Sequence, residues 1–418
     1  MLNTLRNAWK IPDLRNKMLF TLLMLLVFRA GTFISVPGMN IEAIKELVGK
    51  GGLLGFFDVI SGGALDNFSI FTMSISPYIN ASIIMQLLTI AIPSLEALSK
   101  EGEDGRRKIA QYVRYATVVL ALVQGIAISY GLRFYLLERN LWTYTIVALS
   151  LTAGTAFLMW LGELINEKGI GNGISLLIFT GIISRIPGGI NSLYTSYLAK
   201  SINIITLIIF LIVALAIIMA VIYVQEGQRK IPVQYAKRVV GRKMYGGQST
   251  HIPLKVNQAG VMPVIFAMSL ISFPTQIASF FPSSGFYIFM TKYFDWGTIG
   301  HGLLYAVLII GFTFFYTAVS FNPVEVSNNI KKYGGFIPGI RPGRPTTDFI
   351  MKSLNRVTLV GAIFLAMIAI IPIFFMRIIN IPVYFGSTSL LIVVGVAMDF
   401  VKQIEAQMIM RNYQGFLK

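Results

Sequence analysis

Long apolar stretches, separated by short polar segments, follow one another along almost the whole chain. Nine of them have close to the roughly 17–25 residues that a helix needs to cross a bilayer, and a shorter one follows a glycine-rich turn at residues 169–173. Together they predict an all-α polytopic membrane protein with ten transmembrane helices. The predicted spans are residues 18–37, 70–92, 112–132, 141–162, 174–186, 202–224, 259–281, 300–321, 357–376 and 382–398.

The segment between the first two predicted spans is apolar but repeatedly interrupted. Non-helical backbone is tolerated at membrane depth only where protein or water surrounds it. We therefore expect this segment to fold back into the protein rather than to cross the bilayer. The interruptions are Gly51, Gly52, Gly55, Asp58, Gly62, Gly63, Asp66 and Asn67.

The chain divides after the fifth predicted span. Because an odd number of spans precedes the division, the second five helices enter the membrane in the opposite sense to the first five, as in proteins built from inverted repeats. We predict an N-terminal half at residues 1–187, an external hinge loop at residues 188–201 and a C-terminal half at residues 202–418. Two such halves would meet at a central seam.

Composition and charge agree with a membrane protein. Hydrophobic residues make up 55% of the chain and charged residues 13%, whereas soluble domains carry about 25% charged residues. With ten spans, the termini and the even-numbered loops hold 26 of the 35 Lys and Arg residues and the odd-numbered loops hold eight, the last being Arg29 within the first span. Because basic residues gather on cytoplasmic loops, we expect a multi-pass plasma-membrane protein with both termini in the cytoplasm.

Signatures of enzymes and cofactor sites are missing from the sequence. The chain has no cysteine, and its two histidines belong to no HExxH motif. Residues 169–175, GIGNGIS, contain the glycines of a phosphate loop but follow no strand, so we interpret them as a turn that starts a helix. We predict no enzymatic activity, no cofactor and no metal site, and any work of transport must be driven from outside this chain.

Arg29 is the one ionisable residue well inside a predicted span. It is either a functional residue or a structural residue that binds backbone carbonyls. Proton- or sodium-coupled transport usually requires Asp, Glu or His within the membrane, and Glu163 and Asp399 lie only near span ends. An inverted-repeat secondary transporter of a small solute is thus the alternative function, and a scaffold subunit without a pore is a third.

Two basic loops are longer than a connection between helices requires. Residues 225–258 carry seven Lys or Arg, and residues 322–356 carry six around the turn IPGIRPGRP. The preference for basic cytoplasmic loops explains the sign of this charge. Their length, the alternation that permits a hairpin in the first loop, and the Pro and Gly residues of the second also fit docking of an acidic or RNA-bearing partner.

Two isoleucine pairs recur at a spacing of four residues. Ile79 and Ile83 share one face of the second span, and Ile174 and Ile178 share one face of the fifth. Ordinary packing or lipid contact accounts for such pairs. If both faces point at one axis, they instead form a hydrophobic constriction.

Five blocks of the sequence closely resemble the SecY family, the channel subunits of protein-conducting translocons. The blocks are residues 61–88 (SGGALDNFSIFTMSISPYINASIIMQLL), 164–175 (LINEKGIGNGIS), 235–267 (YAKRVVGRKMYGGQSTHIPLKVNQAGVMPVIFA), 332–346 (KYGGFIPGIRPGRPT) and 384–399 (YFGSTSLLIVVGVAMD). The resemblance implies ten helices in two five-helix halves around a central hourglass pore. It implies a bacterial inner-membrane channel that moves unfolded polypeptides across the membrane and releases membrane segments sideways into lipid.

The resemblance also implies roles for particular residues. A plug at residues 55–67 would rest against a ring of apolar side chains at the pore waist, and spans two and seven would form a lateral gate for signal sequences. The ring residues are Ile79, Ile83, Ile174, Ile178, Ile265 and Ile392. The plug residues are Phe56, Phe57, Val59, Ile60 and Leu65, and the gate residues are Ser82, Gln86, Thr89, Ser269, Ser272 and Gln276.

By the same resemblance, the basic loops would dock the ribosome, through its RNA and proteins, or the SecA motor ATPase. Arg341 matches the family's functionally central arginine. The implied partners also include the small membrane subunits SecE and SecG, unfolded preproteins with their signal sequences, and membrane lipid. The implied docking residues are Arg229, Lys230, Lys237, Arg238, Arg242, Lys243, Arg341 and Arg344.

Overall fold

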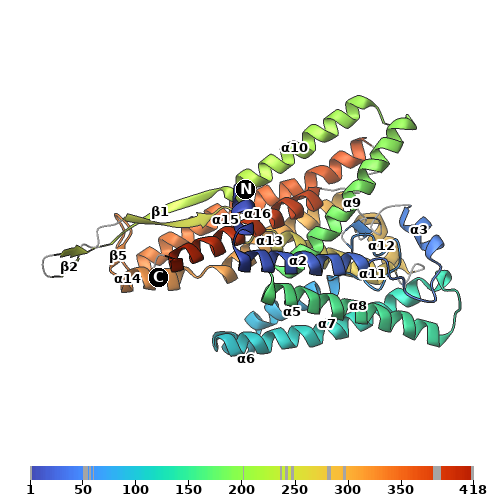
Figure 1. The fold of residues 1–418 in the computed structure, drawn as a ribbon, viewed down its shortest axis with the longest axis horizontal. Coiled ribbons are helices and arrows are strands. Elements are labelled where there is room, and N and C mark those ends of the chain that lie inside the picture. The colour runs from blue at the N-terminus through green and yellow to red at the C-terminus, as the bar shows by residue number, and fades with distance from the viewer. Residues whose placement is uncertain are drawn as a thin grey trace.

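The computed structural model describes residues 2–49, 55, 58–59, 61–200, 202–235, 238–240, 243–245, 249–279, 284–294, 298–379 and 387–415. Most of its helices are long and run along the long axis of the molecule (Figure 1). Each predicted span overlaps one of them, so the predicted helical, membrane-spanning fold is confirmed. These helices are α2 (Pro12–Gly31), α5 (Ser76–Ala91), α7 (Glu103–Gly131), α8 (Leu141–Lys168), α9 (Gly173–Leu198), α10 (Ile204–Glu226), α11 (Met262–Ser279), α13 (Ile299–Ser320), α15 (Arg344–Ile379) and α16 (Ser387–Gly415).

Within the described residues, six helices are long and apolar enough to cross a membrane, or seven if α5 and α6 (Pro93–Lys100) form one broken span. The two helices of that pair meet at 100°. The bend lies at Ile92, whose extended backbone (ψ 114°) precedes Pro93. A residue before proline is pushed out of the helical region by the proline ring, so the chain must turn at this point.

Most of residues 188–201, which were predicted to form an external loop, are helical instead. Helix α9 continues through Pro187 and ends only at Leu198. Proline removes one backbone hydrogen bond from a helix, but its fixed φ is compatible with helical geometry, and the residues that follow it complete three more turns. The connection to α10 is therefore confined to the few residues between Leu198 and Ile204.

Strands form a projection at one end of the helical body (Figure 1). Strands β1 (Gln228–Tyr235) and β4 (Ser249–Lys255) pair in antiparallel fashion, with β5 (Gly335–Phe336) on the other side of β1. The hairpin predicted for residues 225–258 is thus present. Its tip carries a second antiparallel pair, β2 (Arg238–Val240) and β3 (Lys243–Tyr245). Short helices complete the fold: α1 (Leu2–Trp9), α3 (Ile41–Gly49), α12 (Gly285–Phe294), α14 (Pro323–Lys332) and the 3₁₀ helix η1 (Arg133–Tyr135).

An apolar base fixes this projection to the body. Ile231 and Val233 alternate along β1 with exposed residues, as one buried face of a strand requires. They pack in a cluster with Leu254 of β4 and Ile350 and Leu354 of α15. Because the loops contribute their own apolar cluster, the basic residues around it are carried by a defined structure.

Two apolar clusters fill the helical body. The larger cluster includes residues of α2, α5, α8, α9, α11, α13, α15 and α16, and so joins both sides of the predicted division of the chain. The smaller cluster contains only residues between Val36 and Leu151. The larger cluster is therefore the main place where the two halves of the sequence meet. A much smaller third cluster also joins them, through Leu14, Met18 and Ile404.

Candidate functional site

The six predicted ring isoleucines lie in the larger apolar cluster. Ile79 and Ile83 come from α5, Ile178 from α9, Ile265 from α11 and Ile392 from α16, and all five are buried. Ile174 is partly buried and packs against the same cluster. Four helices, two from each half of the sequence, thus bring these side chains together. Val264, next to Ile265, is also fully buried in this cluster.

The turn before α9 positions its isoleucines. Asn172 caps the helix by accepting a hydrogen bond from the Ser175 amide at 3.2 Å. The Gly173 amide donates to Asn166 Oδ1 at 2.7 Å, which ties the turn to the end of α8. A Cβ on Gly173 would lie 2.0 Å from the Gly162 carbonyl oxygen, so only glycine permits this approach. The interpretation of GIGNGIS as a helix-start turn is confirmed.

Residues 55–67, which we call the plug segment, are only partly described. Phe56, Phe57 and Ile60 lie outside the described residues. Val59 and Leu65 are buried, as predicted for residues that rest on protein. However, Leu65 belongs to the smaller apolar cluster and not to the isoleucine cluster. Leu65 is therefore not among the buried residues that pack with the ring, in contrast to the prediction.

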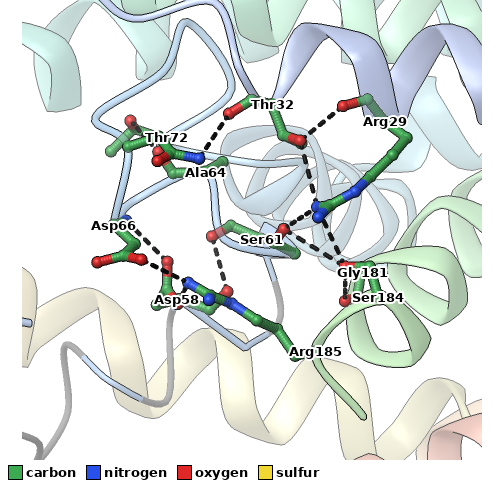
Figure 2. A network of polar contacts seen from close by, with 12 residues as sticks. Arg29, Thr32, Asp58, Ser61, Ala64, Asp66, Thr72, Gly181, Ser184 and Arg185 are labelled. Carbon is green, nitrogen blue, oxygen red and sulfur yellow. Dashed lines mark hydrogen bonds and ion pairs between the residues drawn. The ribbon is translucent and has the colours of Figure 1, made fainter. Parts of the chain in front are cut away.

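Two arginines contact the plug segment, as Figure 2 shows. Arg29 of α2 donates to the Gly62 carbonyl and to Ser184 Oγ of α9, the latter at 3.3 Å. Arg185 of α9 forms an ion pair with Asp58 and a second one, at 3.3 Å, with Asp66. The role of Arg29, left open by the sequence, thus includes carbonyl binding.

The acidic residues of the plug segment are themselves linked. The Asp66 amide donates to Asp58 Oδ1 at 2.8 Å, and Ser61 Oγ donates to the Asp58 carbonyl at 3.2 Å. The Asp58 side chain is 7% exposed, so its charge depends on these partners and on Arg185. In the sequence, Asp58 and Asp66 were noted only as interruptions, and Arg185 stood at the end of the predicted span 174–186 with no role assigned to it. Charged residues of opposite sign in segments predicted to lie at membrane depth are expected to pair, and this signal could have predicted the contact of Arg185 with the two aspartates.

Glycines at positions 62 and 63 permit the close approach of the plug segment to α9. Both have left-handed backbone angles, with φ of +70° and +89°, which glycine adopts without steric cost. A Cβ on Gly62 would lie 2.8 Å from the Gly181 Cα, and a Cβ on Gly63 would lie 3.0 Å from the Arg185 guanidinium carbon. A side chain at either position would displace the segment from α9.

A polar contact crosses the seam between α5 and α11. Ser269 Oγ donates to Asn80 Oδ1 at 2.8 Å, and both residues are buried. Asn80 was not among the predicted gate residues. Ser272 instead donates to the Met268 carbonyl of its own helix at 2.6 Å.

The other predicted gate residues lie on the same two helices. Gln86 Nε2 donates to Ser82 Oγ at 3.3 Å, and Thr89 Oγ1 donates to the Met85 carbonyl at 2.7 Å. Both of these hydrogen bonds lie within α5. Gln276 is part of α11, but its side chain lies outside the described residues.

The predicted docking residues lie on or beside the β projection. Arg229 and Lys230 are exposed on β1, and Arg341 and Arg344 are exposed at the turn before α15. Thr346 Oγ1 donates to the Arg341 carbonyl at 2.9 Å, which fixes this turn. Arg238 and Lys243 belong to β2 and β3 at the tip, and Lys237 and Arg242 lie outside the described residues.

The fold and the site define an α-helical membrane protein whose two groups of helices meet around an apolar centre with a separately held segment beside it. The SecY family model matches residues 69–401. The protein translocase subunit SecY of Halalkalibacterium halodurans is 50% identical over 100% of both chains. The chain therefore belongs to the SecY family.

Solved structures agree with this fold. A protein-conducting channel aligns with a TM-score of 0.70 at 19% identity, covering 94% of this chain and 93% of that chain. Sec61 in the canine ribosome–channel complex from the endoplasmic reticulum aligns with a TM-score of 0.66 at 18% identity, covering 94% of this chain and 93% of that chain. The comparisons do not support the alternative of a small-solute transporter.

Proposed function

We propose that this chain forms a bacterial inner-membrane channel that translocates unfolded polypeptides and releases membrane segments laterally into lipid. The observation that carries the proposal is the burial of ring isoleucines from α5, α9, α11 and α16 in one cluster. An unfolded chain carries side chains of every kind, so a conduit for it cannot use specific polar ligands without retaining some substrates. Isoleucine offers weak, non-directional contacts. It also opposes ion leakage, because an ion at an apolar waist loses water and gains no ligand.

The plug segment would complete the seal of the resting channel. Its burial beside both apolar clusters supports this role, since Ala64 belongs to the isoleucine cluster and Leu65 to the other. The segment has no helix between Ser61 and its end at Asn67. Such a segment can be displaced by an entering chain without unfolding a helix.

Lateral release would occur between α5 and α11. These two helices pack directly against each other and carry the polar contact between Asn80 and Ser269. They come from different halves of the chain, so the hydrogen bond links the halves. Its loss on separation can be offset by polar groups of a signal sequence or by water.

The β projection would bind the driving partner, either the ribosome or the SecA motor. Exposed arginines at the fixed turn and on β1 support this, because arginine suits phosphate and carboxylate recognition. A structural neighbour was determined within a ribosome–channel complex. With both termini cytoplasmic, the projection would face the cytoplasm, and the small subunits SecE and SecG would cover lipid-facing helices.

Site-specific crosslinking tests the channel proposal. A photoreactive amino acid at Ile79 or at Ile392 should form adducts with a stalled secretory nascent chain. The same probe at Ile208, which is half exposed on α10, serves as the control and should form none. Adducts at Ile208 alone, or at no position, would favour a scaffold subunit without a pore.

A further inference from the structure

Among the described residues of the plug segment, every polar contact to another element goes to one half of the molecule. The described residues 58–67 form such contacts with Arg29 of α2, with Thr32 just after α2 and with Ser184 and Arg185 of α9. Each of these partners precedes residue 187. The apolar neighbours of Leu65, between Val36 and Leu151, also belong to this half. Ala64 packs in the larger cluster, to which both halves contribute, through an apolar side chain of only one methyl group.

The two arginines hold the segment in different ways. Arg29 binds a backbone carbonyl, so its contact depends on the path of the chain at Gly62 and not on side-chain identity. Arg185 binds two carboxylates, which are eight residues apart and lie on either side of the glycine turn. Together these contacts fix the position of the turn and close the loop that it forms (Figure 2).

Breaking the contact of Arg185 with Asp58 and Asp66 leaves all three charges without these partners. Hydrogen bonds between ionised groups are roughly twice as strong as neutral ones, and separating a buried pair is costly because a charge is left uncompensated. The Arg185 side chain is 29% exposed and that of Asp58 7%. Displacement of the plug segment therefore requires water or an incoming chain to replace these partners.

We infer that Arg29 and Arg185 form a two-point catch that fastens the plug segment to the N-terminal half, so that parting of the two halves leaves the segment seated. This inference rests on the proposed channel function. Opening of the seam between α5 and α11 breaks the Asn80–Ser269 hydrogen bond but none of the catch contacts. Seam opening and unsealing are then separate events, and a chain that enters the pore must break the catch itself.

Thiol labelling tests the catch. The chain has no cysteine, so Ser61→Cys, a nearly isosteric change at a buried position (2% exposed), introduces a single reporter. In proteoliposomes, a membrane-impermeant maleimide should react with it slowly. Adding Arg185→Gln should speed labelling about tenfold, the shift expected when hydrogen bonds to a charged group are lost.

Two further variants keep the test clear. Arg133→Gln removes a partly exposed arginine that stacks on Tyr130 and Phe134 and makes no polar contact with the described residues of the plug segment, and it should leave the labelling rate unchanged. Asp58→Asn with Asp66→Asn should raise the rate as Arg185→Gln does, and combining all three changes should add little because the same contact is removed. Equal rates in the parent and in Arg185→Gln would overturn the catch.

A separate measurement tests whether the plug segment is attached to the N-terminal half alone. Asn80→Cys and Ser269→Cys, bridged by a long bifunctional thiol reagent that holds the seam apart, should leave the resting ion conductance at the parent level. Adding Arg185→Gln to the bridged protein should then raise it. A rise on bridging alone would overturn the assignment.

Preprotein translocation by the parent protein, reconstituted with SecE, SecG, the SecA motor and ATP in the same proteoliposomes, tests the proposed function separately. Absence of translocation would refute the channel whatever the labelling shows. Translocation with unchanged labelling in Arg185→Gln would refute the catch alone.

Discussion

Ser269 on α11 donates a buried hydrogen bond to Asn80 on α5, and this bond joins residues 189 positions apart in the chain. Asn80 Nδ2 has no hydrogen-bond partner among the described residues. The contact therefore satisfies only part of the hydrogen-bonding capacity of the Asn80 side chain. This hydrogen bond between α5 and α11 stabilises the closed seam, and the two helices can still separate at a moderate cost in free energy.

Removing this hydrogen bond should loosen the seam. Ser269→Ala deletes a hydrogen bond that contributes about 0.5–1.5 kcal/mol, so preproteins with a shortened apolar signal sequence should be translocated more efficiently. Ser272→Ala is the matched control, because Ser272 bonds only to its own helix at Met268. An equal gain in both variants would show that the effect does not arise from the seam contact.

Polar or small residues at the apolar centre should make the channel leak. Replacing Ile79 and Ile178 together with Asn or Gly offers a partner to hydrated ions or widens the constriction, and resting conductance in reconstituted bilayers should rise. Ile208→Asn, on the half-exposed face of α10, should not change it. Unchanged conductance in the double variant would contradict the assignment of the ring.

Deleting residues 57–65 should leave a folded but leakier protein. These residues contribute no regular spanning helix, so the packed helices can remain while the seal is lost. Circular dichroism and size-exclusion chromatography report the fold, and bilayer conductance reports the seal. Loss of folded protein would show that the segment belongs to the structural core.

The glycine turn should tolerate no side chain. Gly62→Ala places a Cβ against Gly181 and forces a left-handed backbone that costs about 1–2 kcal/mol for other residues, so the plug segment should seat less firmly and conductance should rise. Gly311→Ala is the control, since a Cβ there meets nothing within 4 Å on helix α13. Leakage from the control as well would refute a specific role for the turn.

Neutralising the basic turn should weaken binding of a phosphate-rich partner. Arg341→Ala with Arg344→Ala should lower ribosome affinity and reduce the slope of log K against log salt by up to about 2 if each arginine contacts a phosphate. Titration of the solubilised protein with ribosomes over a series of KCl concentrations measures both quantities. Arg133→Ala, far from the projection in sequence, should change neither. If ribosome affinity stays constant while SecA binding falls, the motor is the partner of this turn.

Local chemistry made several elements predictable from the sequence. Apolar length identified the spans, alternation in residues 228–235 indicated the hairpin, and Asn172 with its glycines marked the start of α9. Each of these signals acts over a few neighbouring residues. The loop predicted at residues 188–201 was wrong as far as Leu198, since α9 continues through Pro187.

The sequence by itself determined that this chain spans a membrane, where its helices run and that it belongs with the SecY family. Only the tertiary structure decided that Asp58 meets Arg185, 127 residues away, that Leu65 packs outside the isoleucine cluster and that Asn80 is the partner of Ser269. Such contacts depend on how each helix is rotated about its axis when it packs, and in these nearly uniformly apolar helices no polar face specifies that rotation.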